Sequence, residues 1–555
     1  MSVFDYKRRQ SREVNIGGIP LGGGNPVRVQ SMTNTSTMDT EGSVAQCRRI
    51  ADAGAQYVRL TAQGVREAEN IGVIRGILRE NGYTVPLVAD IHFNPRAAFA
   101  AAEVTDKVRI NPGNFVDPGR TFKKLEYTDE EYAAELDRID KAFTPFLDVC
   151  REHGTAIRIG VNHGSLSDRI MSRYGDTPAG MVESAMEFLR VAVKRGFYDI
   201  VISIKASNVV VMVETVRRLV KAMDAENMSF PLHLGVTEAG DGEDGRVKSA
   251  VGIGTLLAEG IGDTIRVSLS EAPEAEIPVA KALVDYICSR GDAQPIEGGY
   301  AKGYDSIMPQ RRKSVAVGTV GGDNLPAVIA VGETTLDDYM TIDASAPLDR
   351  NIAKAKAHPG KVLVVTTSHP NRPGSIQALA HALTDAGIDN PVVPMIDYGN
   401  ASVEDVTLMA AADFGAMLLN GLRDGVWIKG KNLDNDTIVR LALGILQATR
   451  LRISKTEYIA CPGCGRTLFD LQSTLKAVKE ATSHLKGLKI GVMGCIVNGP
   501  GEMADADYGY VGAASGHVSL YKNKECVEKN IPQSEAIPRL IALIKSCGDW
   551  QEPTN

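Results

Sequence analysis

A repeated pattern of strand-like and helix-like segments most constrains how this chain can fold. Between Val27 and about Cys288, eight short runs rich in β-branched residues alternate with segments of helical periodicity. Eight such units in roughly 260 residues match the number and length of a (β/α)8, or TIM, barrel. A doubly wound sheet is the competing fold, but it usually has fewer units. We therefore predict an α/β protein that begins with a TIM barrel, with strands at Val27–Gln30, Tyr57–Leu60, Leu87–Ile91, Lys107–Ile110, Ala156–Val161, Ile200–Ile204, Leu232–Val236 and Thr264–Val267.

The pattern changes after about residue 290, where the stretch Gln294–Gly303 contains Pro and Gly and marks a boundary. The segment that follows has further strand-like runs, including Ala416–Leu419, and helix-like runs, but few polar side chains that would converge. The C-terminal segment predicts a helix at Leu468–Leu485, a strand at Leu488–Met493, a strand pair near Tyr508–Val518 and a closing helix near Ser534–Ser546. We predict three domains: the barrel (1–290), an inserted α/β domain (291–455) and a small α+β domain (456–555).

Polar residues stand at the predicted C-terminal ends of the barrel strands, where TIM-barrel enzymes carry their active sites. Two like charges about 4 Å apart repel by about 4 kcal/mol at an effective dielectric constant of about 20. Pairing with Asp90, Glu238 or surface acids can offset one or two such charges, whereas a polyanionic ligand offsets a whole cluster. We therefore predict a phosphorylated or diphosphorylated substrate. The cations at these ends are Arg59, Arg109, Arg158, Lys205 and Arg266, and His92, Asn114, Asn162 and Ser268 accompany them.

Three of the eight cysteines, Cys461, Cys464 and Cys495, lie in two turns rich in Gly and Pro. Glu502 is the nearest residue that could complete a metal site. Three thiolates and a carboxylate would be unusual for structural zinc, which normally takes four Cys or His ligands. They suit a [4Fe–4S] cluster with one exchangeable ligand. A zinc knuckle and three reduced thiols remain the alternatives.

Composition excludes several classes of protein. The net charge of −7 does not indicate general binding to nucleic acid or anionic membranes. No apolar run approaches the roughly 20 residues that span a bilayer. The basic N-terminus, with Lys7 and Arg8, is not followed by an apolar signal region. Eight cysteines in so long a chain do not form a disulfide framework, and Cys47, Cys150, Cys288, Cys526 and Cys547 are predicted to be packing residues. We expect a soluble protein of a reducing cytosol.

The motifs resemble those of the 4-hydroxy-3-methylbut-2-enyl diphosphate synthase family, which serves the methylerythritol phosphate route to isoprenoids. In the C-terminal segment the resemblance rests on Cys461-Pro-Gly-Cys464-Gly-Arg-Thr467 and Gly494-Cys495-Ile-Val-Asn498-Gly-Pro-Gly-Glu502. Many relatives have Ser at the position of Gly463. In the barrel the resemblance rests on the strand ends Val58-Arg59-Leu-Thr61, Ala89-Asp90-Ile-His92-Phe-Asn94, Arg109-Ile-Asn111-Pro-Gly-Asn114, Arg158-Ile-Gly-Val-Asn162, Ser203-Ile-Lys205, Gly235-Val-Thr237-Glu238 and Arg266-Val-Ser268.

This resemblance implies an iron–sulfur oxidoreductase whose [4Fe–4S] cluster is bound by Cys461, Cys464, Cys495 and Glu502. The implied reaction is the two-electron reductive ring opening and dehydration of 2-C-methyl-D-erythritol 2,4-cyclodiphosphate, with ferredoxin or flavodoxin as the electron donor. Glu238 resembles the family's proton donor, although a salt bridge to Arg246 is the other interpretation, and Glu502 is expected to give way to a substrate oxygen. The substrate contacts are expected from Arg59, His92, Arg109, Asn114, Arg158, Asn162, Lys205, Arg266 and Ser268.

The middle segment resembles the inserted, barrel-like domain of the three-domain form of these synthases, known from plants and some bacteria, where it acts as a spacer. Because no transit-like extension precedes the barrel, we expect a bacterial, cytoplasmic protein. A folded insert has about the dimension of a barrel, so it can carry the cysteines to the mouth of the same chain's barrel. We therefore predict an active site formed within one chain.

Two hypotheses from other classes compete with this one. A non-redox iron–sulfur hydro-lyase also uses three cysteines and an open iron, and it would be active without an electron donor. A pterin-type barrel transferase with a zinc-binding C-terminal module would be colourless and free of iron.

Overall fold

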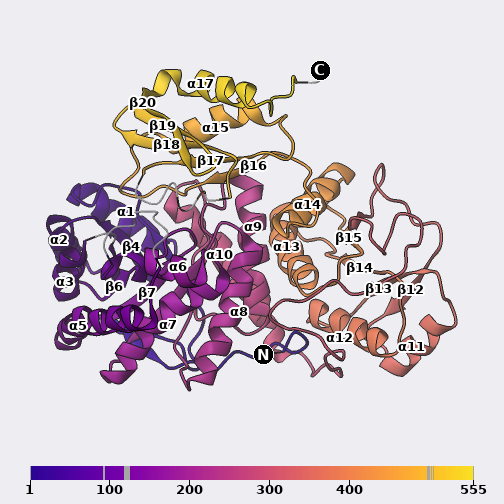
Figure 1. Ribbon diagram of the computed structural model, residues 1–555. Helices are drawn as coiled ribbons and strands as arrows, with labels where there is room; N and C mark the ends of the chain where they lie inside the picture. Colours follow the sequence, from indigo (N-terminus) through magenta and orange to yellow (C-terminus); the bar gives the residue numbers. More distant parts are fainter. Residues whose placement is uncertain are drawn as a thin grey trace. The chain divides into compact units, whose positions relative to one another are not determined.

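The computed structural model describes residues 2–91, 94–117, 126–496, 501, 503 and 505–553 (Figure 1). The chain forms two compact units. The first consists of Met1–Arg9, Arg246–Ile261 and Lys281–Ser454, and the second of Gln10–Gly245, Gly262–Ala280 and Lys455–Asn555. Among the helices described, none has both the length and the apolar character needed to cross a membrane.

The second unit contains a closed barrel of eight parallel strands, which confirms the predicted TIM barrel. Neighbours in the sheet follow the order β8-β7-β6-β5-β4-β3-β10-β9. A parallel bridge between Ile202 and Leu232 joins β8 to the start of β9 and closes the ring. The strands are β3 (Arg28–Met32), β4 (Tyr57–Ala62), β5 (Leu87–Ile91), β6 (Lys107–Ile110), β7 (Ala156–Asn162), β8 (Ile200–Lys205), β9 (His233–Leu234) and β10 (Thr264–Ile265).

Helices follow the strands, and local capping residues set where several of them begin. The longest begins with a capping box, in which Thr128 and Glu131 each satisfy the other's backbone N–H. It ends at Gly154, which has a φ of 66°. Two short helices, α4 and α6, were not predicted. The helices are α1 (Thr40–Asp52), α2 (Val65–Glu80), α3 (Pro95–Val104), α4 (Pro112–Phe115), α5 (Asp129–His153), α6 (Asp168–Tyr174), α7 (Pro178–Lys194), α8 (Val209–Ala225), α9 (Gly242–Ala258) and α10 (Glu276–Cys288), with 3-10 turns at Pro273–Ala275 and Ser289–Asp292.

A small hairpin covers the N-terminal end of the barrel. Its strands, β1 (Val14–Ile16) and β2 (Ile19–Leu21), are antiparallel. Val14, Ile16 and Leu21 are fully buried and pack with the barrel residues Tyr57 and Val88, among others. This apolar plug leaves the C-terminal ends of the strands as the end at which polar side chains gather.

The C-terminal module of the second unit is a five-stranded sheet covered by two helices. Strands β16 (Glu457–Ala460), β17 (Lys489–Met493) and β18 (Tyr508–Ala514) are parallel, and β19 (His517–Lys522) and β20 (Glu525–Pro532) continue the sheet antiparallel. Helices α15 (Leu471–Thr482) and α17 (Gln533–Ser546) pack on it around a buried apolar core. The sequence predicted β17 and a strand pair near Tyr508–Val518, but neither β16 nor β20. Strand β20 escaped prediction because this edge strand is mostly exposed and carries Glu and Lys where an apolar alternation would signal a strand.

The inserted segment, in the first unit, forms a five-stranded parallel sheet with the order β11-β15-β14-β13-β12. Strands β12 to β15 thus neighbour one another in sequence order, and β11 lies beside β15. The strands are β11 (Ala327–Val328), β12 (Tyr339–Asp343), β13 (Val362–Thr366), β14 (Val392–Asp397) and β15 (Gly425–Lys429). The helices are α11 (Leu348–Lys356), α12 (Arg372–Asp385), α13 (Val403–Leu419) and α14 (Asn435–Ala448).

The predicted strand at Ala416–Leu419 was wrong, because these residues form the last turn of α13. These residues end a mostly buried helix of 17 residues, which is longer than a typical strand. The buried Asp413 on this helix accepts hydrogen bonds from Arg290, Tyr286 and Tyr398. The strand lies a few residues later, at β15.

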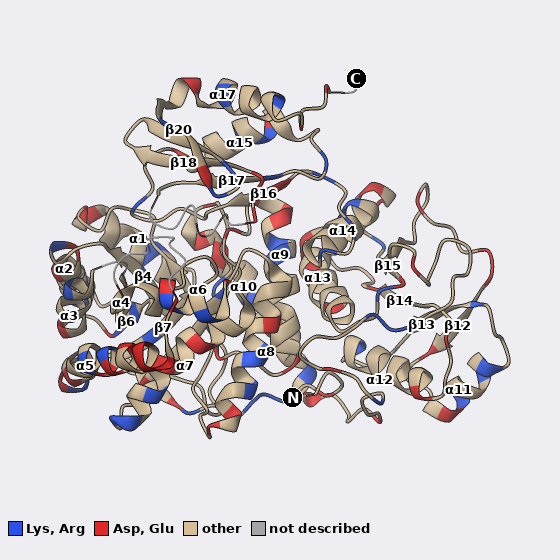
Figure 2. Ribbon diagram, in the orientation of Figure 1, with Lys and Arg blue, Asp and Glu red and all other residues tan. Residues whose placement is uncertain are grey.

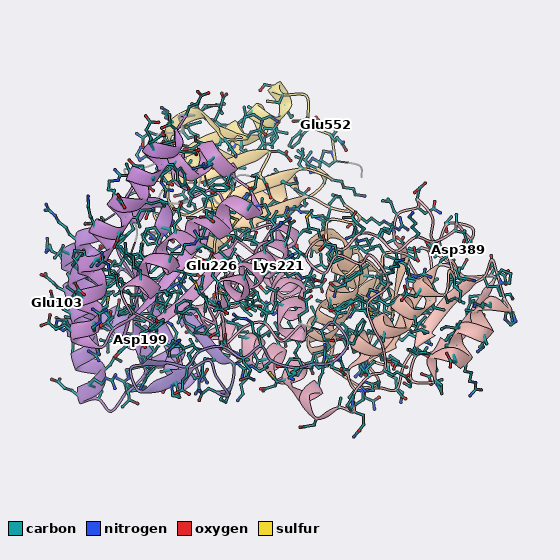
Figure 3. The ribbon with its side chains drawn as sticks, turned by 60° about the horizontal axis from the view of Figure 1, so that its bottom comes forward. Glu103, Asp199, Lys221, Glu226, Asp389 and Glu552 are labelled. Atoms are coloured by element: carbon teal, nitrogen blue, oxygen red, sulfur yellow. The ribbon has the colours of Figure 1, made fainter. Side chains whose placement is uncertain are left out.

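Charged residues are interspersed along the helices of each unit (Figure 2). Exposed examples on the barrel include Glu103 on α3 and Lys221 on α8 (Figure 3). The charged residues of the barrel mouth, described next, are in contrast buried.

Candidate active site

A cavity of about 90 Å³ lies at the C-terminal ends of the barrel strands, within the second unit. Barrel residues form one wall of the cavity, and loops of the C-terminal module form the other. The barrel contributes Met32, Arg59, Asp90, Arg109, Arg158, Asn162, Lys205, Thr237, Glu238, Arg266 and Ser268. The module contributes Cys461, Cys464, Arg466, Thr467 and Cys495, together with neighbouring backbone.

All five cations predicted at the mouth line this cavity and are at least 94% buried. Arg59 is on β4, Arg109 on β6, Arg158 on β7 and Lys205 at the end of β8, while Arg266 directly follows β10. Gly160 makes room for this crowding, because a Cβ there would lie 2.4 Å from Arg109 Nε. Five fixed cations at one mouth require compensating negative charge.

Two carboxylates supply part of that charge. Glu276 binds Arg266 through two parallel hydrogen bonds of 2.9 Å. Asp90 lies 3.3 Å from Arg109 and 4.0 Å from Arg158. It also lies 3.7 Å from Arg466, which comes from the C-terminal module. Asp90 is thus the centre of a cluster of arginines, as the sequence predicted for one or two of the cations.

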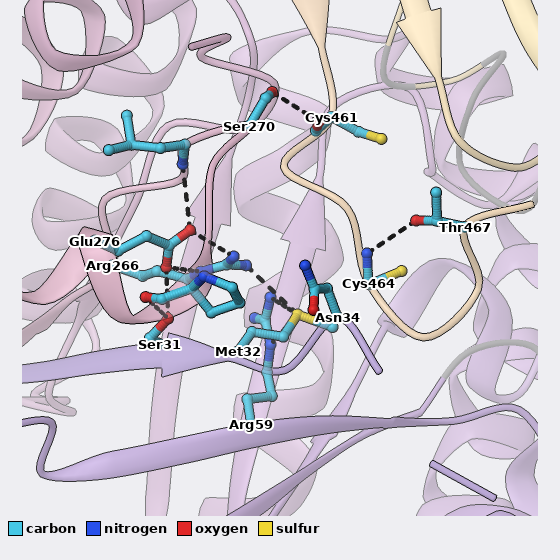
Figure 4. Close-up of polar contacts among 12 residues, drawn as sticks. Ser31, Met32, Asn34, Arg59, Arg266, Ser270, Glu276, Cys461, Cys464 and Thr467 are labelled. Atoms are coloured by element: carbon cyan, nitrogen blue, oxygen red, sulfur yellow. Dashed lines mark hydrogen bonds and ion pairs between the residues drawn. The ribbon is translucent and has the colours of Figure 1, made fainter. Parts of the chain in front are cut away.

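A methionine sulfur, and not a carboxylate, receives the donors of Arg59. Met32 Sδ accepts hydrogen bonds from Arg59 Nε at 3.0 Å and Nη2 at 2.7 Å, and from Arg266 Nη1 at 3.4 Å (Figure 4). A thioether is a weak acceptor. This contact therefore holds the Arg59 guanidinium group in place without neutralising its charge, which is available to an anion.

The electrostatics of the mouth favour an anionic ligand. Burial lowers the pKa of Arg59 to about 10, and Arg266, Arg109 and Arg466 add to the effect while Asp90 opposes it. Burial also lowers the pKa of Arg158 and of Lys205, again with help from neighbouring cations. In addition, Arg158 Nε and Nη1 donate no hydrogen bond to any residue the structure describes. Phosphate oxygens would satisfy these donors and relieve the repulsion.

Glu238 follows β9 and is buried at the edge of the cavity. Its φ of 50° is in the left-handed region, which a non-glycine residue adopts at a cost of about 1 kcal/mol or more. Strand β9 ends at Leu234, earlier than predicted, and Glu238 lines the cavity. The next residue, Ala239, forms a parallel bridge with Ala460 of the C-terminal module. Glu238 and Cys461 therefore lie on two backbones that are paired with each other.

The three predicted cysteine ligands line the same cavity. Cys461 Sγ accepts a hydrogen bond from Gly494 N at 3.2 Å, and its carbonyl accepts one from Ser270 Oγ at 2.9 Å (Figure 4). Thr467 Oγ1 accepts a hydrogen bond from Cys464 N at 3.0 Å. Backbone N–H groups directed at sulfur are typical of iron–sulfur sites.

The donor set bears on the kind of metal group that these residues can hold. Within the described ranges, no three His, Cys, Asp or Glu side chains form a group that could hold one metal ion. Three cysteine thiols at one cavity are donors that suit an iron–sulfur cluster. The predicted fourth ligand, Glu502, lies outside the described residues.

Contacts on both sides of the cavity hold the C-terminal module against the barrel. Ion pairs join Lys479 to Asp241 and Lys455 to Asp244. The C-terminal module lies so close to the barrel at Gly465 that a Cβ atom there would be 2.6 Å from the carbonyl oxygen of Thr35. Barrel residues and cysteines line one cavity within one compact unit of the chain.

Comparison with known proteins identifies the family. A model described as the GcpE TIM-barrel domain matches residues 11–281, and one described as the GcpE protein C-terminal domain matches residues 457–546. A Bacteroides fragilis protein named 4-hydroxy-3-methylbut-2-en-1-yl diphosphate synthase (flavodoxin) is 57% identical, over 100% of this chain and 98% of its own length. The chain belongs to the GcpE family.

Other GcpE relatives agree over the whole length. Proteins with the same name from Porphyromonas gingivalis and Chlorobaculum tepidum are 49% and 41% identical, covering 100% and 99% of this chain and 100% and 91% of their own. Among solved structures, a Yersinia pestis DHPS is 12% identical with a TM-score of 0.34, and it covers 49% of this chain and 98% of its own. A similarity at this level does not indicate a shared function.

Most of the predicted residues meet in the GcpE cavity. Asn162 accepts a hydrogen bond from Arg109 at 3.1 Å, and Ser268 lines the wall. Asn114 is buried on α4 but is not part of the cavity lining. His92 lies outside the described residues, as Glu502 does.

Three GcpE residues in or beside the cavity were missed by sequence reasoning. Arg466 was visible only as a letter of the cysteine motif, although two of its donor atoms, Nε and Nη1, have no hydrogen-bond partner among the described residues. Met32 ends β3 and is itself apolar, so it gives no polar signal. Glu276 opens a helix and resembles an ordinary first-turn acid.

Proposed function

We propose that this chain makes 4-hydroxy-3-methylbut-2-enyl diphosphate, the product for which its relatives are named, from 2-C-methyl-D-erythritol 2,4-cyclodiphosphate. Two electrons and protons enter, a carbon–oxygen bond to the ring phosphate breaks, and one oxygen leaves as water. The observation that carries the proposal is the meeting of barrel cations and three cysteines in one cavity.

In this proposal the barrel holds the diphosphate. The cations are Arg59, Arg158 and Lys205, whose pKa values are lowered by burial. A bound dianion raises these pKa values and so favours the charged forms. Arg109 and Asn162 are already hydrogen-bonded to each other, so both are oriented before substrate arrives. His92, Asn114, Arg266 and Ser268 complete the proposed contacts.

Cys461, Cys464, Cys495 and Glu502 are proposed to hold a [4Fe–4S] cluster, which would pass electrons from the donor protein to the substrate. Glu238 is proposed to deliver the proton to the departing hydroxyl group. Its backbone is fixed beside that of Cys461 through Ala239 and Ala460, so the carboxylate faces the cysteine side of the cavity.

The cluster is tested by anaerobic purification, followed by the visible spectrum and iron and sulfide content. We expect about four irons and four sulfides per chain in the wild type, and loss of both in Cys495→Ser. Cys526→Ser is the matched control, because Cys526 lies in the same module but does not line the cavity. A zinc-containing, colourless protein would instead support the transferase hypothesis, and turnover without a donor would support the hydro-lyase.

We propose that the electron donor is flavodoxin, which the relatives' names include. Ferredoxin is the alternative. Turnover with each donor at equal concentration, under anaerobic conditions, distinguishes them. A cytoplasmic location is part of the same proposal, since flavodoxins and ferredoxins are supplied there.

The domain division 1–290, 291–455 and 456–555 and the one-chain active site also remain proposals. A mixture of Glu238→Gln and Cys495→Ser chains tests the second. Because one chain provides both walls of the cavity, we expect no recovery of activity. Substantial recovery would show that barrel and cysteines pair between chains.

A further inference from the structure

The inserted domain contains a cavity of about 300 Å³, which lies entirely within the first unit. It is formed by the segment 301–313, the last turns of α12 and the turn that follows α13. Its volume is at the lower end of the range for small-molecule sites. Neither the proposed reaction nor the relatives' names assign it a role.

Cations dominate the polar part of this cavity. Lys302, Arg311, Arg312 and Lys313 line it, and Asp305 is the one acid among the described lining residues. Three of the four cations are consecutive in the sequence, at a place where the chain has no regular secondary structure. Such a concentration of positive charge around a concave site attracts an anion.

Arg312 is the most informative of these residues. Its donors bind Thr384 Oγ1 at 3.2 Å and the backbone carbonyls of Asn390 and Ile388. Burial lowers the pKa of Arg312, only partly opposed by Asp424 and Asp389. None of the ion pairs found among the described residues neutralises it. The guanidinium group is thus oriented by neutral partners and keeps its charge beside the cavity.

The rest of the wall is uncharged. Ala301, Ala380, Leu422 and the ring of Tyr304 contribute apolar surface. His381 packs edge-on against Tyr304, with ring centroids 4.5 Å apart, and its Nδ1 accepts a hydrogen bond from Ala301 N. Burial lowers the pKa of His381 to about 4, so the ring is neutral at pH 7. One side of the cavity therefore suits a phosphate, and the other suits a short hydrocarbon.

A purely structural role accounts for part of this arrangement. Arg312 lies beside the carbonyls that follow the C-terminal end of α12, where a cation is favourable. Arg311 pairs with Asp424 at 3.2 Å, and its Nε has no hydrogen-bond partner among the described residues. The structural role of Arg312 does not explain why Lys302 and Lys313, both exposed, flank the same cavity as Arg311. A ligand explains all four together.

We propose that the inserted domain binds a small organic phosphate in this cavity. The phosphate contacts Arg311, Arg312 and Lys313, and a short apolar chain lies against Tyr304 and Leu422. The site is separate in sequence and in lining from the barrel mouth, and it stands whether or not the proposed reaction is correct.

The experiment is hydrogen–deuterium exchange of the full-length chain, read by mass spectrometry, with butyl phosphate as the probe. We expect saturable protection of peptides that cover 301–313 and 384–390. Inorganic phosphate is expected to protect them at least about tenfold less tightly, because it leaves the apolar wall uncovered. Peptides from the barrel mouth provide an internal comparison, since they report anion binding at the other site.

The decisive variant is Lys313→Glu, which reverses an exposed charge and is expected to leave the fold unchanged. We expect it to weaken protection of 301–313 about tenfold or more, with mouth peptides unaffected. Lys431→Glu is the matched control, since Lys431 is exposed in the same domain and outside the cavity lining. Absence of protection at 301–313 in the wild type, equal weakening in both variants, or equal affinity for butyl phosphate and inorganic phosphate would each overturn the proposal.

Discussion

Replacing Asp90 by Asn tests whether the barrel mouth is organised to hold an anion. The substitution removes one negative charge and keeps the shape of the side chain. Asp90 lies 3.3, 3.7 and 4.0 Å from Arg109, Arg466 and Arg158, and each pair is worth about 4–5 kcal/mol of gross attraction at an effective dielectric constant of about 20. Removing one partner of a buried ion pair costs a net of about 3–5 kcal/mol.

We therefore expect ligand-free Asp90→Asn to unfold about 3–5 kcal/mol more easily than the wild type. At about 2 °C per kcal/mol for a large domain, this lowers the melting temperature of the second unit by roughly 6–10 °C. Inorganic diphosphate should restore much of the difference, because it supplies the missing charge among the same arginines. The assay is differential scanning calorimetry of anaerobic protein with and without diphosphate.

Asp199→Asn is the matched control, because Asp199 is an exposed acid of the same unit at the opposite end of the barrel strands. We expect Asp199→Asn to have the melting temperature of the wild type, and diphosphate to raise that temperature by the same amount in both proteins. The reasoning is refuted if Asp90→Asn melts with the wild type in the absence of diphosphate. It is also refuted if diphosphate stabilises both proteins equally.

Three further predictions concern the mouth and the inserted domain. Met32→Leu removes the sulfur acceptor of Arg59, and we expect weaker diphosphate binding by calorimetric titration, about tenfold, with the fold retained. Arg59→Ala, Arg109→Ala and Arg158→Ala should each raise KM while circular dichroism stays unchanged, and unchanged KM in all three would contradict the assignment of the mouth. His381 has a folded pKa of about 4, below its ordinary 6.5, so the stability that it contributes is present above pH 6.5 and is lost as the pH falls toward 4. His381→Gln should therefore remove about 3 kcal/mol of the acid sensitivity of the first unit, measured by melting temperature between pH 7 and pH 4.

The strand ends of the barrel were predictable because each combines a periodic apolar run with a cation that such a run does not otherwise contain. Arg109, Arg158 and Lys205 stood out for this reason, and they lie where the periodicity placed them. The cysteine turns were equally legible, because Gly and Pro surround Cys461 and Cys495. Local sequence was enough wherever one segment carried both the element and the chemistry.

What escaped prediction depends on contacts between distant segments. Whether Arg266 is paired could not be read from its own strand, because its partner Glu276 lies in a helix ten residues later. Met32 acts as a hydrogen-bond acceptor only because Arg59 and Arg266, from two other strands, direct their guanidinium groups at its sulfur. The end of α13 was misassigned as a strand since four apolar residues fit either element, and only the length of the whole buried run decides between them.

The bridge between Ala239 and Ala460 has a consequence for how such a site can change over time. It is made by main chain, so it places no demand on side-chain chemistry. Both residues are buried and have the smallest side chain that carries a Cβ. Their neighbours Glu238 and Cys461 can thus keep their separation while surrounding sequence drifts, provided that neither alanine grows. Selection would therefore act mainly against larger side chains at Ala239 and Ala460, and less against changes of polarity in the residues around them.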